Sequence, residues 1–237
     1  MFSLVIPMYN EAAILPDTLA TLNAYMQDHF DEYEILFSDD GSTDGSAALV
    51  ANCGYPNIRV ISYPQNQGKG CAVRCGMLAA RGDLILFTDC DLAYGTEAIR
   101  ALYDAFSKGD FDIMIGSRNL GKDGYEGYSF LRRVASKVYI KTLCIAGGFS
   151  LSDSQCGFKA FTKEAAHKVF PYCETDGFAF DFEAILLADR QKLKIGEFPV
   201  KVINHRASKI HVWSDSLKML ADLRRIKKHV RSVTLDK

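Results

Sequence analysis

The sequence predicts an α/β protein in which helices flank a mostly parallel central sheet. Short apolar runs and helical patterns alternate about every dozen residues through the first half of the chain, as in βαβ units. The runs are apolar throughout instead of alternating with polar residues, which indicates strands that are buried on both faces. Turn-forming and charged residues follow each run, at the strand ends where parallel sheets bind ligands.

The expected elements follow this pattern in chain order. We expect strands over residues 2–6, 34–37, 58–61, 84–87 and 112–116. Helical spacing of apolar residues occupies the intervals between them, over residues 14–26, up to residue 50, over 71–80 and over 99–106. The second half is less regular, with helices over 130–146 and 180–187, a loop over 153–159, a strand-like run over 195–203 and a final helix from about residue 214.

The composition is that of one sizeable globular domain or two small ones. The chain has 237 residues, of which 48% are hydrophobic and 24% charged, and we expect neither a signal peptide nor a membrane-spanning segment. A formal net charge of -1 gives no reason to expect a nucleic-acid partner. Seven cysteines without a Cys-X-X-Cys pair favour free thiols in a reducing cytoplasm over disulfides or a zinc site.

Two carboxylates follow one of the predicted buried strands. Residues 84–87 lead through Thr88 into Asp89, Cys90 and Asp91. Side chains two residues apart on an extended segment point to the same side, and two such carboxylates repel unless a cation lies between them. A hard divalent cation that leaves room for phosphate oxygens, Mg or Mn, fits this arrangement. Taken alone, so short a pattern is more often a pair of solvated acids in a turn.

Charged residues at the other strand ends strengthen the metal hypothesis. The carboxyl ends of parallel strands meet at one edge of a sheet, so residues from separate loops come together there. The residues that we expect to converge on this edge are Asp39, Asp40, Lys69, Asp89, Asp91 and Arg118.

A series of motifs then appears in one order along nearly the whole chain. Val5-Ile-Pro-Met-Tyr-Asn-Glu11, Asp39-Asp-Gly-Ser-Thr-Asp44, Asn66-Gln-Gly-Lys-Gly70 and Asp89-Cys-Asp91 resemble the inverting family 2 glycosyltransferases of the GT-A fold. Gly116-Ser-Arg118, Asp153-Ser-Gln-Cys-Gly-Phe-Lys159, Phe180-Asp-Phe-Glu183 and Ser208-Lys209 resemble its polyprenyl-phosphate branch. That branch comprises dolichyl-phosphate β-glucosyltransferases and dolichyl-phosphate mannose synthases.

The resemblance implies a nucleotide-sugar donor and a polyprenyl-phosphate acceptor. Asp39 would contact the base and ribose of the nucleotide, with Asp40 beside it. Asp89 and Asp91 would hold Mg or Mn on the diphosphate, and Lys69 either contacts the diphosphate or is a surface charge. The remaining donor-site residues that the resemblance implies are Pro7, Tyr9 and Glu11 in the nucleotide pocket, with Arg206 and Lys209 near the diphosphate.

The acceptor decides whether a general base is needed. The resemblance implies that Arg118 meets the acceptor phosphate, together with Arg132 or Arg133. A phosphate is already anionic at neutral pH, so positioning by arginine suffices. A hydroxyl acceptor would need a carboxylate base, for which Asp181 is the first candidate and Asp153 the second. The residues expected to act in catalysis are Asp91, Arg118, Asp181 and Lys209.

The sugar is predicted from a departure within the branch. Mannose synthases tend to carry Gln two positions after the second Asp, where it helps to bind the metal, but this chain has Ala93. The glucosyltransferases tend to have a small residue there, and Phe180-Asp-Phe-Glu183 also resembles theirs. UDP-glucose is therefore favoured as donor, with GDP-mannose as the alternative.

The resemblance implies one GT-A domain over residues 1–212, with a Rossmann-like nucleotide-sugar half at 1–118 and an acceptor half at 119–212. Residues 213–237 form an amphipathic basic helix that either packs on the domain or lies at an anionic membrane surface. The helix over 130–146 is an equal candidate for membrane contact, because a polyprenyl acceptor must be met at a membrane. We expect a cytoplasmic protein, peripheral at the cytoplasmic face of a membrane; the sequence does not indicate an oligomeric state.

Three other functions compete with this hypothesis. The first is sugar transfer to a hydroxyl of a polysaccharide, a protein or a small molecule. The second is nucleotidyl transfer, which is disfavoured because Pro7-Met-Tyr-Asn-Glu11 stands where a Gly-rich basic loop would be expected. The third is non-catalytic binding of a nucleotide sugar, against which the intact Asp89, Asp91, Arg118 and Lys209 argue.

Overall fold

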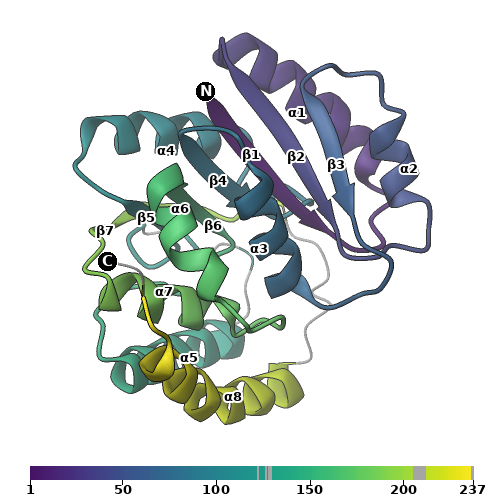
Figure 1. The fold of residues 1–237 in the computed structure, drawn as a ribbon. Helices are drawn as coiled ribbons and strands as arrows, with labels where there is room; N and C mark the ends of the chain where they lie inside the picture. Colours follow the sequence, from purple (N-terminus) through teal and green to yellow (C-terminus); the bar gives the residue numbers. More distant parts are fainter. Residues whose placement is uncertain (122, 126, 128–129, 205–211, 236–237) are drawn as a thin grey trace.

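A seven-stranded sheet forms the centre of the molecule, and helices cover both of its faces (Figure 1). The computed structural model describes residues 1–237 except 122, 126, 128–129, 205–211 and 236–237, and the side chains of 130–132 and 212–221 also lie outside the description. The strands are β1 (Phe2–Met8), β2 (Tyr33–Asp39), β3 (Ile58–Ser62), β4 (Leu84–Thr88), β5 (Ile113–Ser117), β6 (Phe158–Thr162) and β7 (Ile195–Pro199).

The strands lie in the order β3-β2-β1-β4-β6-β5-β7. Strand β6 is antiparallel to both of its neighbours, whereas the other neighbouring pairs are parallel. The predicted mostly parallel α/β fold is therefore confirmed. The helices are α1 (Leu15–His29), α2 (Ser46–Ala51), α3 (Lys69–Ala79), α4 (Glu97–Lys108), α5 (Phe130–Gly147), α6 (Lys163–Val169), α7 (Phe180–Arg190) and α8 (Val212–Ser232), with a 3-10 turn η1 (Phe170–Tyr172).

The central strands divide their side chains between two hydrophobic cores. On β1, Leu4 and Ile6 belong to the core that includes residues of α1 and α4. Val5 points to the opposite face and belongs to the core that includes residues of α3, α6 and α7. All three side chains are fully buried. Burial on both faces explains why these strands are apolar throughout instead of alternating with polar residues.

Strand β6 and helix α6 were not predicted. The residue pattern predicts a loop over residues 153–159, but β6 begins at Phe158 and lies between β4 and β5. Lys159 pairs with Phe87 of β4 and with Ile115 of β5. The lysine made this run look polar and exposed, whereas its side chain is in fact buried. Strand β7 ends at Pro199, earlier than the predicted run over 195–203.

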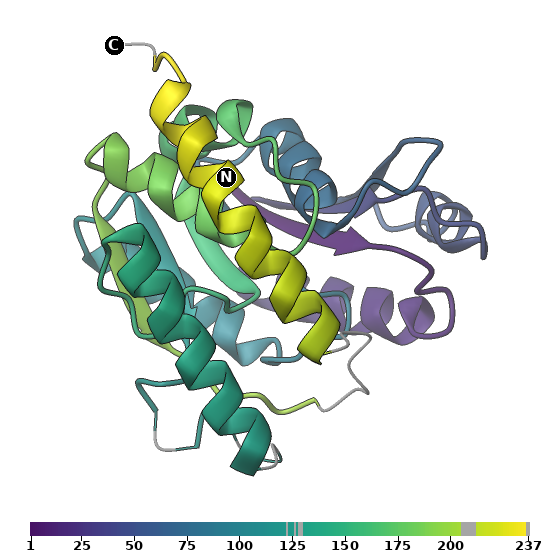
Figure 2. The ribbon, with the colours of Figure 1, turned by 90° about the horizontal axis from the view of Figure 1, so that it is seen from below.

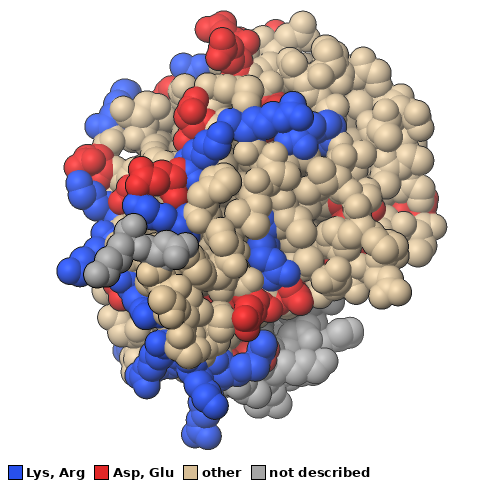
Figure 3. Space-filling view, in the orientation of Figure 1, with Lys and Arg blue, Asp and Glu red and all other residues tan. Residues whose placement is uncertain are grey.

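The last helix lies against α7 and crosses the side of the molecule that faces the viewer in Figure 2. In its described part, Leu223, Ile226 and Val230 are buried in the core, so this part packs its apolar stripe on the domain. Basic side chains remain exposed on α8 and on the neighbouring α5, and Lys and Arg gather over this region at the bottom of Figure 3. Within the described residues, we find no helix whose length and apolar character would let it cross a lipid bilayer.

Candidate active site

Two acids stand at the carboxyl end of β4, as predicted. Cys90 and Leu92 are buried, whereas Asp89 and Asp91 are partly exposed. The carbonyl of Cys90 accepts a hydrogen bond of 3.0 Å from the hydroxyl of Thr18. This alternation fixes the apolar residues to the domain and leaves both carboxylates accessible at the sheet edge.

The turn after Asp91 is held by the segment that follows β7. The Asn204 side-chain amide donates to the carbonyls of Leu92 at 3.0 Å and Asp91 at 3.3 Å. The backbone N–H of Ile203 donates to the carbonyl of Ala93 at 2.8 Å. Leu92 has a φ of 49°, which a branched residue adopts only when its surroundings impose it. These contacts fix the turn that aims the Asp91 carboxylate.

Lys69, the first residue of α3, forms an ion pair with Asp89. Its Nζ lies 2.5 Å from Asp89 Oδ1, and the two side chains are 24% and 33% exposed. Burial lowers the pKa of Lys69, because it disfavours the charged ammonium. The negative charges of nearby carboxylates have the larger effect and raise the pKa above its usual value; they are Asp89, then Asp181 and Asp91. The ammonium is therefore charged and lies in the field of three carboxylates.

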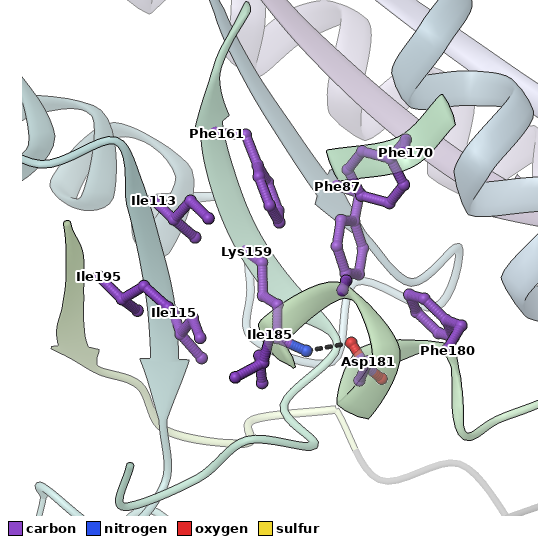
Figure 4. A pocket seen from close by; sticks show the side chains of 11 residues that line it. Phe87, Ile113, Ile115, Lys159, Phe161, Phe170, Phe180, Asp181, Ile185 and Ile195 are labelled. Carbon is purple, nitrogen blue, oxygen red and sulfur yellow. Dashed lines mark hydrogen bonds and ion pairs between the residues drawn. The ribbon is translucent and has the colours of Figure 1, made fainter. Parts of the chain in front are cut away.

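A second ion pair lies in the interior beneath the first. Lys159 of β6 and Asp181 in the first turn of α7 are both buried, and the ammonium bonds to the carboxylate (Figure 4). Burial raises the pKa of Asp181, although Lys159 and then Lys69 favour its charged form. The ammonium also lies 5.7 Å from the ring centroid of Phe87. A cavity of about 10 Å³ adjoins the pair, with room for about one water molecule among mostly apolar walls.

Arg118, at the end of β5, is clamped by Asp153. Its Nε and Nη2 donate to the two carboxylate oxygens at 2.6 and 2.9 Å, and its backbone N–H donates to Oδ2 at 3.1 Å. Asp153 is fully buried. The guanidinium also lies 5.2 Å from the ring centroid of Tyr125. A bidentate pair of this kind fixes both the position and the plane of the guanidinium.

Asp40 organises the loop that precedes α3. Its carboxylate accepts hydrogen bonds from the Tyr63 hydroxyl at 2.6 Å and the Asn66 amide at 2.8 Å. The backbone N–H groups of Gln67 and Gly68 donate to it at 2.8 and 2.9 Å. Gly68 has a φ of 119°, and a Cβ there would lie 2.4 Å from a backbone carbonyl, so glycine is required. Asp40 therefore positions the loop that carries Lys69.

The residues expected in the nucleotide pocket stand at the ends of β1 and β2. Met8 is paired with Asp39, which places Tyr9 and Asp39 near the same point of the sheet edge. Tyr9 is 41% exposed, whereas Pro7 and Asp39 are buried. Asp39 accepts a hydrogen bond from the backbone N–H of Ser42 at 3.2 Å. Glu11, which follows Tyr9 after one residue, is partly exposed, so these two side chains are the accessible part of this group.

Several expected site residues cannot be placed. Arg206 and Lys209 lie outside the described residues, and the side chain of Arg132 is not described. Arg133 is exposed on α5.

The structure brings Lys69, Asp89, Asp91 and Asp181 into one electrostatic cluster. Arg118 follows β5 at the same edge of the sheet, two strands from β4, since Lys159 of β6 pairs with both Phe87 of β4 and Ile115 of β5.

Two positioning residues are not predicted from the sequence. The residue pattern places Lys159 in a loop, although its position within a run of apolar residues is a signal for burial. Asn204 carried no local signal, because its partners lie 112 and 113 residues earlier in the chain.

The carboxylate pair fits a divalent cation. Within the described part of the chain no group of three or more His, Cys, Asp or Glu side chains could hold a metal by itself. Asp89 and Asp91 nevertheless supply two hard oxygen donors and leave positions for phosphate oxygens and water, as Mg requires. Gly157 supports this assignment, because a Cβ there would lie 2.5 Å from Asp89 Oδ2. The glycine therefore leaves space beside Oδ2, whereas Oδ1 is contacted by Lys69.

Known proteins with similar sequences are sugar transferases. Residues 3–170 match the family described as "Glycosyl transferase family 2". The dolichyl-phosphate beta-glucosyltransferase of Dictyostelium discoideum is 34% identical, with 95% of this chain and 73% of that protein aligned. The enzymes of that name from Saccharomyces cerevisiae and Homo sapiens are 34% and 31% identical over 93% of this chain, aligning 72% and 73% of their own lengths.

Solved structures agree on the fold. Glucosyl-3-phosphoglycerate synthase from Mycobacterium tuberculosis, in complex with Mn2+, UDP and phosphoglyceric acid, superposes with a TM-score of 0.73 at 19% identity, over 99% of this chain and 79% of that chain. Mannosyl-3-phosphoglycerate synthase from Rubrobacter xylanophilus gives 0.69 at 20% identity, over 100% and 77%. The fold is the GT-A fold, and the chain belongs to glycosyl transferase family 2.

Proposed function

We propose that this protein transfers glucose, with inversion of configuration, from UDP-glucose to a polyprenyl phosphate. The observation that carries the proposal is the placement at one sheet edge of the carboxylates Asp89 and Asp91, the cation Lys69 and the clamped Arg118. The two carboxylates and Lys69 could bind a diphosphate together with its metal ion, and Arg118 could bind a second anion. The names of the relatives, dolichyl-phosphate beta-glucosyltransferases, support the sugar and the acceptor.

The donor site must stabilise the charge that develops on the leaving diphosphate. Asp89 and Asp91 would hold Mg or Mn, which neutralises that charge when bound. Lys69 adds a second positive charge at the same place, and Asn204 holds the turn that orients Asp91. Mn2+ and UDP in the solved neighbour support a divalent cation and a uridine nucleotide. Ala93 further favours UDP-glucose over GDP-mannose.

The acceptor site needs a fixed cation more than a base. Asp153 holds the Arg118 guanidinium rigidly, which suits recognition of a phosphate by its geometry. The phosphate oxygen carries its charge before it attacks the anomeric carbon, so no proton need be removed. Asp181 is bonded to Lys159 and is therefore poorly placed to act as a free base.

Neutralising the buried pair tests this assignment. We expect the double variant Lys159→Met with Asp181→Asn to transfer sugar to polyprenyl phosphate within about tenfold of the normal rate, because no general base is required. Labelled-sugar transfer at saturating donor measures the rate, and circular dichroism with thermal unfolding checks the fold. A folded double variant that binds Mn2+ and UDP normally but has lost more than about a thousandfold in rate would indicate a catalytic carboxylate and favour a hydroxyl acceptor.

The donor and metal are tested together by offering labelled UDP-glucose or GDP-mannose with a short polyprenyl phosphate. We expect a labelled lipid product from UDP-glucose with Mn or Mg and none with chelator. Transfer from GDP-mannose alone would contradict the glucose assignment. If neither donor reacts although UDP still binds with metal, the polyprenyl-phosphate acceptor is wrong and a hydroxyl acceptor takes its place.

Helix α5 offers a surface for a membrane that carries the acceptor. Val134, Val138 and Ile145 are 42%, 59% and 75% exposed, and their spacing places them on one side of the helix. Lys137 and Lys141 are exposed beside them. An exposed apolar stripe with flanking lysines is typical of helices that lie at an anionic lipid surface. We infer peripheral membrane contact through this face.

Acidic substitutions on that face should separate membrane contact from chemistry. We expect Val138→Asp with Ile145→Asp to weaken cosedimentation with phosphatidylserine-containing vesicles by at least about tenfold. Transfer to a short, water-soluble polyprenyl phosphate should stay unchanged. Leu49→Asp on α2, where the side chain is 41% exposed, is the matched control and should leave vesicle binding intact. Unchanged vesicle binding by the α5 variant would rule out this face.

A further inference from the structure

The ion pair at the end of β4 involves a carboxylate that would also hold the metal. Lys69 Nζ lies 2.5 Å from Asp89 Oδ1, one of the two oxygens of that carboxylate. A Mg ion binds carboxylate oxygen at about 2.0–2.1 Å, so on Oδ1 it would take the place of the ammonium, and on Oδ2 it would share one carboxylate with a second cation. Like charges at such separations repel strongly where the surroundings are partly dry. Within the protein, the charge of Asp89 is thus balanced by Lys69.

We propose that Lys69 is a displaceable counter-ion, which leaves Asp89 when the divalent cation arrives with the donor and then contacts the diphosphate. The inference rests on the proposed nucleotide-sugar site and adds the order in which its charges assemble. The lysine and the metal exchange places at Asp89. The diphosphate supplies the anion that receives the lysine.

The surroundings of Lys69 favour such a movement. The side chain is partly exposed and begins at the N-terminus of α3, between Gly68 and Gly70. Backbone contacts hold the helix start, since the N–H of Gly70 donates to the carbonyl of Asp176 at 2.7 Å. The backbone is therefore fixed, whereas the long side chain has rotamers available. Exchange needs only a movement of the ammonium, with no opening of the fold.

The lysine does not lose all its partners when it leaves Asp89. After Asp89, the carboxylate with the largest effect on its charge is Asp181. Asp181 is held in place by its bond to the buried Lys159 (Figure 4). A fixed carboxylate therefore remains to attract the ammonium after it leaves Asp89.

A coupling between metal and nucleotide follows from this exchange. Without nucleotide the metal must displace the lysine and leave it with fewer anionic partners, so it binds weakly. With UDP present the diphosphate both ligates the metal and accepts the lysine, so each ligand strengthens binding of the other. Removal of the lysine should strengthen metal binding to the empty site and weaken its dependence on UDP.

Titration with Mn2+, followed by electron paramagnetic resonance of the free ion, tests the proposal without an activity readout. We expect Lys69→Met to bind Mn2+ at least about tenfold more tightly than the unaltered protein when no nucleotide is present. The factor by which UDP increases Mn2+ affinity should fall by at least about tenfold. Lys69→Arg, which keeps the charge, is the matched control and should keep weak binding without UDP.

The outcomes separate this inference from the function on which it rests. Equal or weaker Mn2+ binding by Lys69→Met, with normal Mn2+ binding by the unaltered protein in UDP, would overturn the exchange and leave the metal site intact. Absence of Mn2+ binding by the unaltered protein even with UDP and GDP would overturn the metal site and the exchange together. Thermal unfolding of each variant ensures that the comparison is made between folded proteins.

Discussion

Asp91→Asn should lower the turnover number for sugar transfer by about three orders of magnitude. The substitution removes one of two anionic oxygen donors from the carboxylate pair and so weakens metal-assisted stabilisation of the leaving diphosphate. A thousandfold loss corresponds to about 4 kcal/mol of transition-state stabilisation, within the range of such charge effects. In the unaltered protein, Asp91 Oδ1 accepts a hydrogen bond of 3.1 Å from the backbone N–H of Ala93. The side-chain oxygen of asparagine can accept the same bond, so the turn is preserved.

A matched substitution at the opposite end of the same strand gives the control. Asp83 precedes β4 and is exposed at the edge remote from the site, where it pairs with the N-terminal ammonium. Asp83→Asn should leave turnover within about twofold, as expected for a surface pair of small energetic effect. Labelled transfer from UDP-glucose with saturating Mn2+ measures both variants. If the folded Asp91→Asn variant kept more than a tenth of the normal turnover number, Asp91 would not be a metal ligand.

Arg118→Met should damage both the fold and the reaction. The substitution leaves the fully buried Asp153 carboxylate without its bidentate partner, which typically costs about 3–5 kcal/mol of unfolding free energy. It also removes the fixed cation proposed to meet the acceptor phosphate. We expect kcat/KM for polyprenyl phosphate to fall at least about a hundredfold, with little change in the KM for the donor.

A second substitution separates the two effects. Arg118→Met combined with Asp153→Asn removes the unpaired charge, so chemical denaturation should show recovery of much of the lost stability. Transfer to polyprenyl phosphate should stay low in this double variant, because the phosphate still has no guanidinium to meet. Recovery of transfer together with stability would show that Arg118 is structural and that another cation binds the acceptor.

Much of the fold could be predicted from local runs of apolar residues in the sequence. The strands that were predicted are apolar because both of their faces are buried, and this property is visible in the residues themselves. Strand β6 was missed because Lys159 interrupts its apolar run. The partner that makes burial of this lysine possible, Asp181, lies 22 residues later on α7. Only the folded chain shows that pairing.

The candidate site was predictable to the same extent. The spacing of Asp89 and Asp91 directly after a buried strand predicts the carboxylate pair, and the loop motifs indicate the same sheet edge. The sequence could not show that Asp40 is engaged by the loop before α3, or that Lys69 pairs with Asp89. These are distances between separate loops, set by packing of the whole domain.

The most direct test compares two acceptors that differ only in a phosphate group. Purified protein, UDP-glucose and Mn2+ are incubated with a short polyprenyl phosphate or with the matching polyprenol, and the anomeric configuration of any product is read by nuclear magnetic resonance. We expect a β-linked glucosyl phosphate from the polyprenyl phosphate and no product from the polyprenol. Transfer to the polyprenol, or an α-linked product, would contradict inverting transfer to an acceptor phosphate.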